Sequence, residues 1–253
     1  MRTDRLAIVC LAALHDDPLS EITAASYALR ARHENLGLIS PNKIMLAFVD
    51  VSSDYDSDFI PGKDKIETPV LGNEFASSNG SLGVYLVAHG VDGDIPLFGP
   101  KKFYGVMKKL NLLDNLTKIA IIACGLAGRN DFSGASETRK SYLFELCKEL
   151  GENNVTPKIA GWTDFITVVY DQMWEEGEGR LGKKVMATKR KQIDYLSKIG
   201  RRAAYSAKPG QTKGKLALMN SETKKEQKLY YVYREGGVIK LAREDWVDKP
   251  LAS

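Results

Sequence analysis

The sequence is poor in several features that would assign a chain to a familiar class. Its 253 residues include only three cysteines, Cys10, Cys124 and Cys147, at unrelated spacings. A set so sparse and odd in number predicts neither a disulfide framework nor a zinc site, and it favours a reducing compartment. The apolar run Leu6–Leu14 is too short to cross a membrane. We therefore expect a cytoplasmic protein with no signal peptide, no transmembrane segment and no metal centre.

Two motifs of common enzyme classes are also missing. No Gly-x-Ser-x-Gly sequence is present, which argues against a serine hydrolase. No glycine-rich phosphate loop follows the first apolar run, which argues against a nucleotide-binding fold. What is present is an ordinary globular composition, with 43% hydrophobic and 27% charged residues. The length suffices for one domain, or for one domain with a small appendage.

Positive charge is concentrated in the last third of the chain. Residues 178–243 hold 18 lysines and arginines against 5 acidic residues, whereas the whole chain has a net charge of only +4. The rest of the chain is therefore acidic on balance. Such an asymmetry favours an anionic ligand for the C-terminal part. The candidate anion-binding residues are Lys189, Arg190, Lys191, Arg201 and Arg202.

Apolar runs rich in β-branched residues alternate with helical patterns over the first two thirds of the chain. Runs of this kind are typical of buried parallel strands, and the alternation predicts right-handed crossover units. We expect an α/β fold, a three-layer sandwich with a mostly parallel central sheet. The predicted strands are Arg5–Leu14, Lys43–Val51, Gly83–Ala88, Lys118–Ala123 and Lys158–Tyr170, and the predicted helices are Ser20–Asn35, Pro100–Leu113 and Ser136–Gly151.

The remaining segments have weaker patterns. We interpret Ser52–Gly80 as a long surface loop with a short hairpin near Thr68–Leu71. Beyond the core we expect a basic helix at Lys184–Tyr205, a short strand at Lys215–Met219 and a β-hairpin at Lys228–Leu241. This organisation predicts a core of residues 1–175 and a basic, β-rich C-terminal extension of residues 176–253 that packs on the same domain.

The most informative feature is a pair of similar strand endings. The apolar run Gly83–Ala88 ends at His89-Gly90, and the run Lys118–Ala123 ends at Cys124-Gly125, with one predicted helix between them. A right-handed crossover places consecutive parallel strands side by side, with their carboxyl ends at one edge of the sheet. Either residue alone would most simply be structural. Together they predict a thiol nucleophile and its base in one cleft.

These residues resemble a known family. Tyr85-Leu86-Val87-Ala88-His89-Gly90 followed by Ile121-Ile122-Ala123-Cys124-Gly125 is similar to the His-Gly and Ala-Cys signatures of the caspase-like (clan CD) cysteine peptidases. The clan includes caspases, metacaspases, gingipains, clostripain, separase and legumain, and the autoprocessing protease domains of clostridial and RTX toxins. The chain departs from the Gln-Ala-Cys-x-Gly of caspases, because Ile122 replaces the glutamine and the spacing is the looser Ala-Cys-x-x-x-Gly of Ala123, Cys124 and Gly128.

The resemblance implies a thiol endopeptidase, and with it a set of roles. Cys124 is expected to be the nucleophile and His89 to handle the protons, while the backbone N–H groups of Gly90 and Cys124 form the oxyanion hole. The loop Gly125–Ser136, which contains Asp131, lies where caspases carry their processed linker, so autocatalytic cleavage is expected there. By analogy with the toxin domains, inositol hexakisphosphate is a candidate activator through the basic C-terminal part. Calcium, an activator elsewhere in the clan, is a second candidate.

Two other function classes remain open at this point. The chain could have the same fold without activity and serve as a binding module, although both reactive residues are present. It could also be a nucleic-acid- or polyphosphate-binding protein that uses its C-terminal charge. The nucleic-acid reading requires exposed aromatic residues for base stacking, and Tyr230, Tyr231 and Tyr233 of the predicted hairpin are the candidates. The peptidase hypothesis, in contrast, implies a protein or peptide substrate.

Overall fold

The computed structural model describes residues 3–11, 21–35, 37–51, 58–60, 63–91, 93–128, 131–132, 139–163, 166–168, 216–218 and 228–246. Helix α1 is described without some of its side chains, and residues 166–168 and 216–218 are described by their backbone alone. Among the described residues, no helix is long and apolar enough to cross a membrane.

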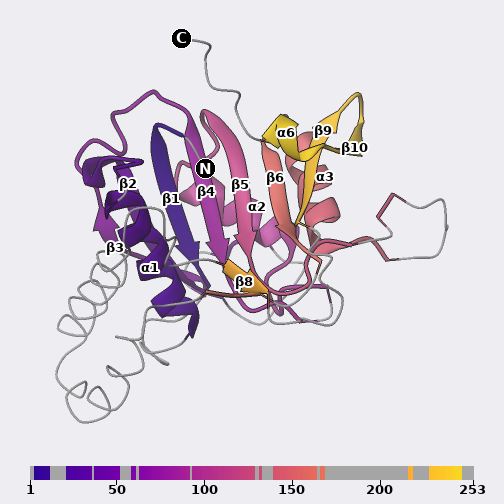
Figure 1. Ribbon diagram of the computed structural model, residues 1–253, viewed down its shortest axis with the longest axis horizontal. Helices are drawn as coiled ribbons and strands as arrows, with labels where there is room; N and C mark the ends of the chain where they lie inside the picture. Colours follow the sequence, from indigo (N-terminus) through magenta and orange to yellow (C-terminus); the bar gives the residue numbers. More distant parts are fainter. Residues whose placement is uncertain are drawn as a thin grey trace.

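The described residues are built around an eight-stranded mixed sheet, in the order β10-β9-β6-β5-β4-β1-β2-β3 (Figure 1). The four central pairings, β2 with β1, β1 with β4, β4 with β5 and β5 with β6, are all parallel. Antiparallel strands extend the sheet at both edges. The strands are β1 (Arg5–Cys10), β2 (Ile44–Asp50), β3 (Lys65–Leu71), β4 (Leu82–Val87), β5 (Leu116–Ile122), β6 (Lys158–Trp162), β9 (Lys228–Arg234) and β10 (Gly237–Lys240).

Helices cover both faces of this sheet, which confirms the predicted three-layer α/β fold. Helix α1 (Glu21–Asn35) and the short α6 (Arg243–Trp246) pack on one face, where they join one hydrophobic cluster. Helices α2 (Pro100–Lys109) and α3 (Tyr142–Glu152) pack on the other face and join a second cluster. Figure 1 shows the sheet between these two layers. The central strands β1, β4 and β5 are almost wholly buried, as their continuous apolar sequences predict.

The structure differs from the sequence prediction at several places. The predicted strand Lys158–Tyr170 is divided, because β6 ends at Trp162 and residues 166–168 belong to another sheet, and the predicted helix Pro100–Leu113 ends at Lys109. Residues 65–71 form no hairpin of their own, because β3 pairs antiparallel with β2 as an edge strand. Helix α3 begins at Tyr142 rather than at Ser136, and the hydroxyl of Ser141 caps it by accepting the N–H of Phe144 at 3.4 Å. An N-cap side chain satisfies a backbone N–H that the first helical turn leaves without a partner.

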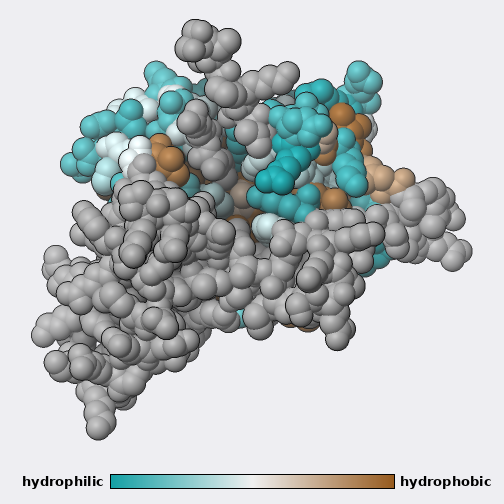
Figure 2. All heavy atoms as spheres, in the orientation of Figure 1, coloured by the Kyte–Doolittle hydropathy of each residue, from teal (hydrophilic) through white to brown (hydrophobic). Residues whose placement is uncertain are grey.

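The C-terminal hairpin belongs to the main sheet. Strands β9 and β10 pair as predicted, and β9 also pairs antiparallel with β6, so that Tyr231 lies opposite Ile159. The described surface near α6, β9 and β10 is mainly hydrophilic (Figure 2). The predicted strand near Lys215–Met219 is present as β8 (Leu216–Leu218), which pairs with β7 (Ile166–Val168) in a separate two-stranded sheet. The predicted basic helix Lys184–Tyr205 lies outside the described residues.

Candidate active site

The carboxyl ends of β4 and β5 lie side by side at one edge of the sheet (Figure 1). The last register pair is Val87 with Ile122, and the N–H of Ala88 still donates to the carbonyl oxygen of Ile122 at 3.2 Å. His89 lies two residues after Val87, and Cys124 lies two residues after Ile122. Since neighbouring strands are about 4.8 Å apart, equal offsets from a paired position place the two residues on adjacent strand ends.

A close backbone contact continues this pairing past the strands. A Cβ atom added to Gly90 would lie 2.0 Å from the carbonyl oxygen of Cys124 and 2.9 Å from its backbone nitrogen. No side chain fits in that space, so a glycine is required for the two loops to approach. The loop after His89 and the loop after Cys124 are therefore packed backbone to backbone. Gly125 has a φ of +63°, which lets the chain turn sharply directly after Cys124.

The three cysteines differ in their access to solvent. Cys10 on β1 and Cys147 on α3 are fully buried, whereas Cys124 is partly exposed. Burial raises the pKa of Cys10 to about 12 and that of Cys147 to about 12. A thiol must lose its proton to act as a nucleophile, so the two buried thiols are unreactive near neutral pH. Of the three, Cys124 is the thiol that a reagent or substrate can reach.

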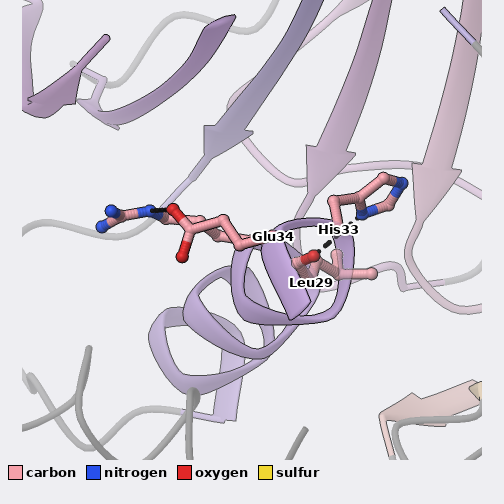
Figure 3. Close-up of polar contacts among 4 residues, drawn as sticks. Leu29, His33 and Glu34 are labelled. Carbon is pink, nitrogen blue, oxygen red and sulfur yellow. Dashed lines mark hydrogen bonds and ion pairs between the residues drawn. The ribbon is translucent and has the colours of Figure 1, made fainter. Parts of the chain in front are cut away.

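The described histidines also divide into a core residue and a surface residue. His33 of α1 is only 2% exposed, and its Nδ1 lies 2.9 Å from the carbonyl oxygen of Leu29 (Figure 3). A carbonyl can only accept, so Nδ1 carries the proton and donates. The ring packs edge-on against Tyr85 of β4, with 5.5 Å between centroids. This arrangement is structural. His89, in contrast, is exposed at the sheet edge, and His15 lies outside the described residues.

The loop after Cys124 is tied to its surroundings by hydrogen bonds. The N–H of Ala127 donates to the carbonyl of Trp162 at 2.9 Å, which links the loop to the end of β6. The N–H of Leu143 donates to the carbonyl of Leu126 at 3.2 Å, which links the loop to α3. The side chains of Leu126 and Ala127 are buried. The backbone around the thiol is therefore held by elements on both of its sides.

Asp131 lies in the predicted processing loop, but its carboxylate is 4% exposed and fully engaged. It accepts hydrogen bonds from Gly128, from the N–H and hydroxyl of Ser141, and from Tyr231. Cleavage beside Asp131 would require this network to open first. Gly125 is partly exposed, and Ser136 lies outside the described residues. A site in this loop for self-processing stays a prediction.

The loop after His89 turns back and meets α3. Val91 and Asp94 form an isolated antiparallel bridge, and the carbonyl of Gly93 accepts the N–H of Tyr142 at 3.3 Å. The carboxylate of Asp94 pairs with Arg139 at 2.5 Å. These contacts give Asp94 a structural role in the loop, and they border a cavity of about 390 Å³ between this loop and the starts of α2 and α3. Asp92 lies outside the described residues.

The candidate anion-binding side chains cannot be placed, because Lys189, Arg190, Lys191, Arg201 and Arg202 all lie outside the described residues. Two of the three tyrosines proposed for base stacking, Tyr230 and Tyr231, are buried, so the proposal is wrong for them, whereas Tyr233 is partly exposed. Tyr230 and Tyr231 are buried in the two hydrophobic clusters, and Tyr233 packs against Gly151 of α3. Strand β9 alternates its side chains between two covered faces, so Tyr230 and Tyr231 are core residues. No group of three or more metal-binding side chains gathers within the described part of the chain.

The sequence analysis missed the structural roles of two residues near the strand ends. Trp162 ends β6 beside the Cys124 loop, and Asp131 joins that loop to α3 and β9. Apart from Gly128, the hydrogen-bond partners of Asp131 stand ten and a hundred residues farther along the chain, so no local pattern reveals them. Only the Ser141 cap has a recognisable local signal, because serine directly precedes an apolar helical pattern.

Comparison with known proteins gives a distant likeness. No protein-family model matches the sequence, and no curated protein matches it. Four chains of solved structures match, including a secreted C11 cysteine protease from Bacteroides thetaiotaomicron in complex with an irreversible peptide inhibitor. The sequences are 13% identical, the TM-score is 0.32, and the match covers 77% of this chain and 57% of that one. The function proposed for this chain therefore rests on its own geometry.

Proposed function

We propose that the protein is a cysteine endopeptidase that uses a dyad of His89 and Cys124. The observation that carries the proposal is the contact between Gly90 and the Cys124 backbone, which brings the two strand endings together. The exposure of His89 and the partial exposure of Cys124 support it, since a substrate can reach both. A solvent-accessible thiol beside an imidazole at the carboxyl edge of a parallel sheet is suited to nucleophilic catalysis.

The chemistry follows from these groups. The Cys124 thiolate attacks the carbonyl carbon of the scissile peptide, and the carbonyl electrons move to oxygen. His89 protonates the departing amine, which leaves an acyl group on the sulfur. Water then attacks the thioester and releases the acid with the regenerated thiol. In this proposal the N–H groups of Gly90 and Cys124 stabilise the oxyanion, and one such donor lowers a barrier of this kind by about 3 kcal/mol.

Activation is part of the proposal and requires its own test. The basic C-terminal part motivates inositol hexakisphosphate as an activating ligand, because a polyphosphate is bound by several converging lysines and arginines. Calcium is the second additive to test. Self-processing within 125–136 would appear as two fragments of the purified protein. None of these regulators is needed for the thiol chemistry itself.

The experiment compares the wild type with Cys124→Ala and His89→Ala, on peptides with Leu, Arg, Lys or Asp before the cut. Each assay is run with and without calcium, inositol hexakisphosphate and a short oligonucleotide. We expect cleavage by the wild type and none by either variant. Cys147→Ala is the matched control, since it removes a thiol that is buried on α3 and distant in sequence from both strand endings.

The outcome is read together with thiol labelling. We expect iodoacetamide to modify Cys124 in the folded protein and to leave Cys10 and Cys147 unmodified, because both are buried. Cleavage that survives in Cys124→Ala would reject the assignment of the nucleophile. A wild type that cleaves no peptide under any of the conditions would reject the endopeptidase itself. Binding of the oligonucleotide with steep salt dependence, without cleavage, would favour the nucleic-acid alternative.

A further inference from the structure

A single buried carboxylate connects three separate parts of the chain. The Oδ2 atom of Asp131 accepts the N–H of Gly128 at 3.1 Å, the hydroxyl of Ser141 at 2.5 Å and the hydroxyl of Tyr231 at 2.8 Å. Its Oδ1 atom accepts the N–H of Ser141 at 2.8 Å. Gly128 belongs to the loop after Cys124, Ser141 caps α3, and Tyr231 lies on β9.

Several observations show that the site is built for a charged acceptor. Asp131 and Tyr231 are both buried, and every contact to the carboxylate comes from a donor. Burial and the neighbouring Asp131 carboxylate both raise the pKa of Tyr231, so its hydroxyl keeps its proton and donates it. Buried carboxylates persist in proteins when hydrogen bonds replace their lost hydration. The ammonium group of Lys140 also binds the backbone carbonyl of Asp131 at 2.6 Å.

The loop after Cys124 is packed tightly against this carboxylate at Gly128. A Cβ atom on Gly128 would lie 2.3 Å from Oδ1 of Asp131, so the backbone lies directly against the carboxylate. Only the three residues 125–127 separate Gly128 from Cys124, and the N–H of Ala127 and the carbonyl of Leu126 are fixed by Trp162 and Leu143. Residues 124–128 therefore form one short segment whose backbone is held by α3, β6 and the Asp131 carboxylate together.

We propose that Asp131 is a positioning residue for the loop that follows Cys124, residues 125–128, which we call the nucleophile loop. It holds Gly128 against α3 and β9, and through that loop it sets the direction of the Cys124 backbone N–H. This catalytic consequence rests on the proposed function, whereas the positioning of the loop does not. Asp131 takes no part in proton transfer, since its oxygens are all occupied by structural donors.

The substitution Asp131→Asn tests this arrangement with almost no change in size. Each carboxylate oxygen accepts one backbone N–H, from Ser141 on Oδ1 and from Gly128 on Oδ2. A backbone N–H cannot become an acceptor, so either orientation of the asparagine amide places its NH₂ group against one of them. The variant thus breaks one anchor and keeps the volume. Tyr231→Phe removes a single hydroxyl donor, and Tyr233→Phe on the same strand is its matched control.

Hydrogen exchange gives a readout that does not depend on activity. We expect the amides of residues 125–128 and 141–143 to exchange at least about tenfold faster in Asp131→Asn, because the loss of a hydrogen bond at a buried charge costs more than about 1.4 kcal/mol. The amides of β1 should exchange as in the wild type. Tyr231→Phe should accelerate the same amides by a smaller factor, and Tyr233→Phe should leave them unchanged. Equal exchange at 125–128 in Asp131→Asn and the wild type would overturn the proposal.

Kinetics distinguish positioning from a general loss of folded protein. In Asp131→Asn we expect kcat on the best peptide to fall about 10- to 100-fold with KM changed less than about threefold, since a misplaced donor affects the transition state most. Alkylation of Cys124 by iodoacetamide uses no oxyanion hole, so its rate should stay within about twofold. Equal losses in both rates would mean that the variant only unfolds, and would overturn the catalytic part of the proposal. If the wild type itself cleaves nothing, the proposed function fails, and the exchange data still decide whether Asp131 holds the loop.

Discussion

Replacing Gly90 by alanine tests the contact that brings the two strand endings together. The added methyl would lie 2.0 Å from the carbonyl oxygen of Cys124, and its nearest neighbours are all backbone atoms. A backbone cannot move aside by changing a rotamer, so one of the loops must shift. Overpacking of this kind costs about 1–3 kcal/mol. For a chain of this length that corresponds to a fall in Tm of about 2–12 °C.

The assay is thermal unfolding of Gly90→Ala and of a matched control, followed by circular dichroism. Gly237→Ala is the control, because an added Cβ on Gly237 of β10 meets no atom within 4 Å. We expect that control to change the stability by less than about 0.5 kcal/mol. An identical Tm for Gly90→Ala and Gly237→Ala would refute the reasoning, since it would mean that the backbones of Gly90 and Cys124 are not in contact. Peptide cleavage by Gly90→Ala should also be lost, because the displaced loops carry His89 and Cys124.

Two further predictions concern buried titratable groups. Folding raises the pKa of Cys10 and of Cys147 to about 12. The folded protein therefore binds more protons than the unfolded chain between about pH 9 and 12. Over that range the free energy of unfolding should fall by up to about 1.4 kcal/mol per pH unit for each thiol. Urea titrations from pH 7 to 11 measure this decline, which Cys147→Ala should make shallower; a pH-independent stability would contradict it. Lys102 and Asp64 form a fully buried pair with 4.0 Å between Nζ and Oδ1. Lys102→Met leaves the Asp64 carboxylate buried without this cation, so it should lower the free energy of unfolding, measured by urea titration, by about 3–5 kcal/mol. The added change Asp64→Asn should restore part of that loss. An unchanged urea midpoint for Lys102→Met would contradict the prediction.

The parts of the fold that the sequence predicts are those that follow from local patterns. The strands β1, β4 and β5 are buried on both faces, so each has a continuous apolar sequence that can be recognised without its partners. The glycines that follow His89 and Cys124 mark the strand endings in the same way. From these the parallel core and the adjacency of the two residues could both be predicted, because crossovers are right-handed.

The parts that could not be predicted depend on distant partners. Strand β3 contains Pro69 and polar residues, a composition that suits an edge strand as well as a loop. The hairpin at 228–241 was recognisable from its alternation, but its pairing with β6 was not, since about sixty-five residues separate the two strands. The role of Asp131 could not be predicted for the same reason, because it depends on a partner far away in the sequence. A buried carboxylate and an exposed one look alike in a sequence, and only the fold brings Tyr231 to Asp131.

The pairing of β6 with β9 also determines how far the C-terminal part can be separated from the core. Six large apolar side chains of 228–246 are buried, namely Leu229, Tyr230, Tyr231, Val232, Leu241 and Trp246. At about 1.5–3 kcal/mol for each buried side chain, their loss would remove on the order of 10 kcal/mol, which equals the whole stability of a typical domain. It would also leave β6 as an unpaired edge and Asp131 without Tyr231.

We therefore expect a chain truncated after residue 175 to be unfolded or aggregated, and one truncated after residue 246 to keep the sheet. Circular dichroism and gel filtration of the two proteins measure this difference. A 1–175 fragment that unfolds cooperatively near the Tm of the full chain would show that the hairpin is dispensable. A fragment that fails to fold would show that the hairpin is part of the core, as the pairing of β9 with β6 and the contact of Tyr231 with Asp131 in the loop after Cys124 lead us to expect.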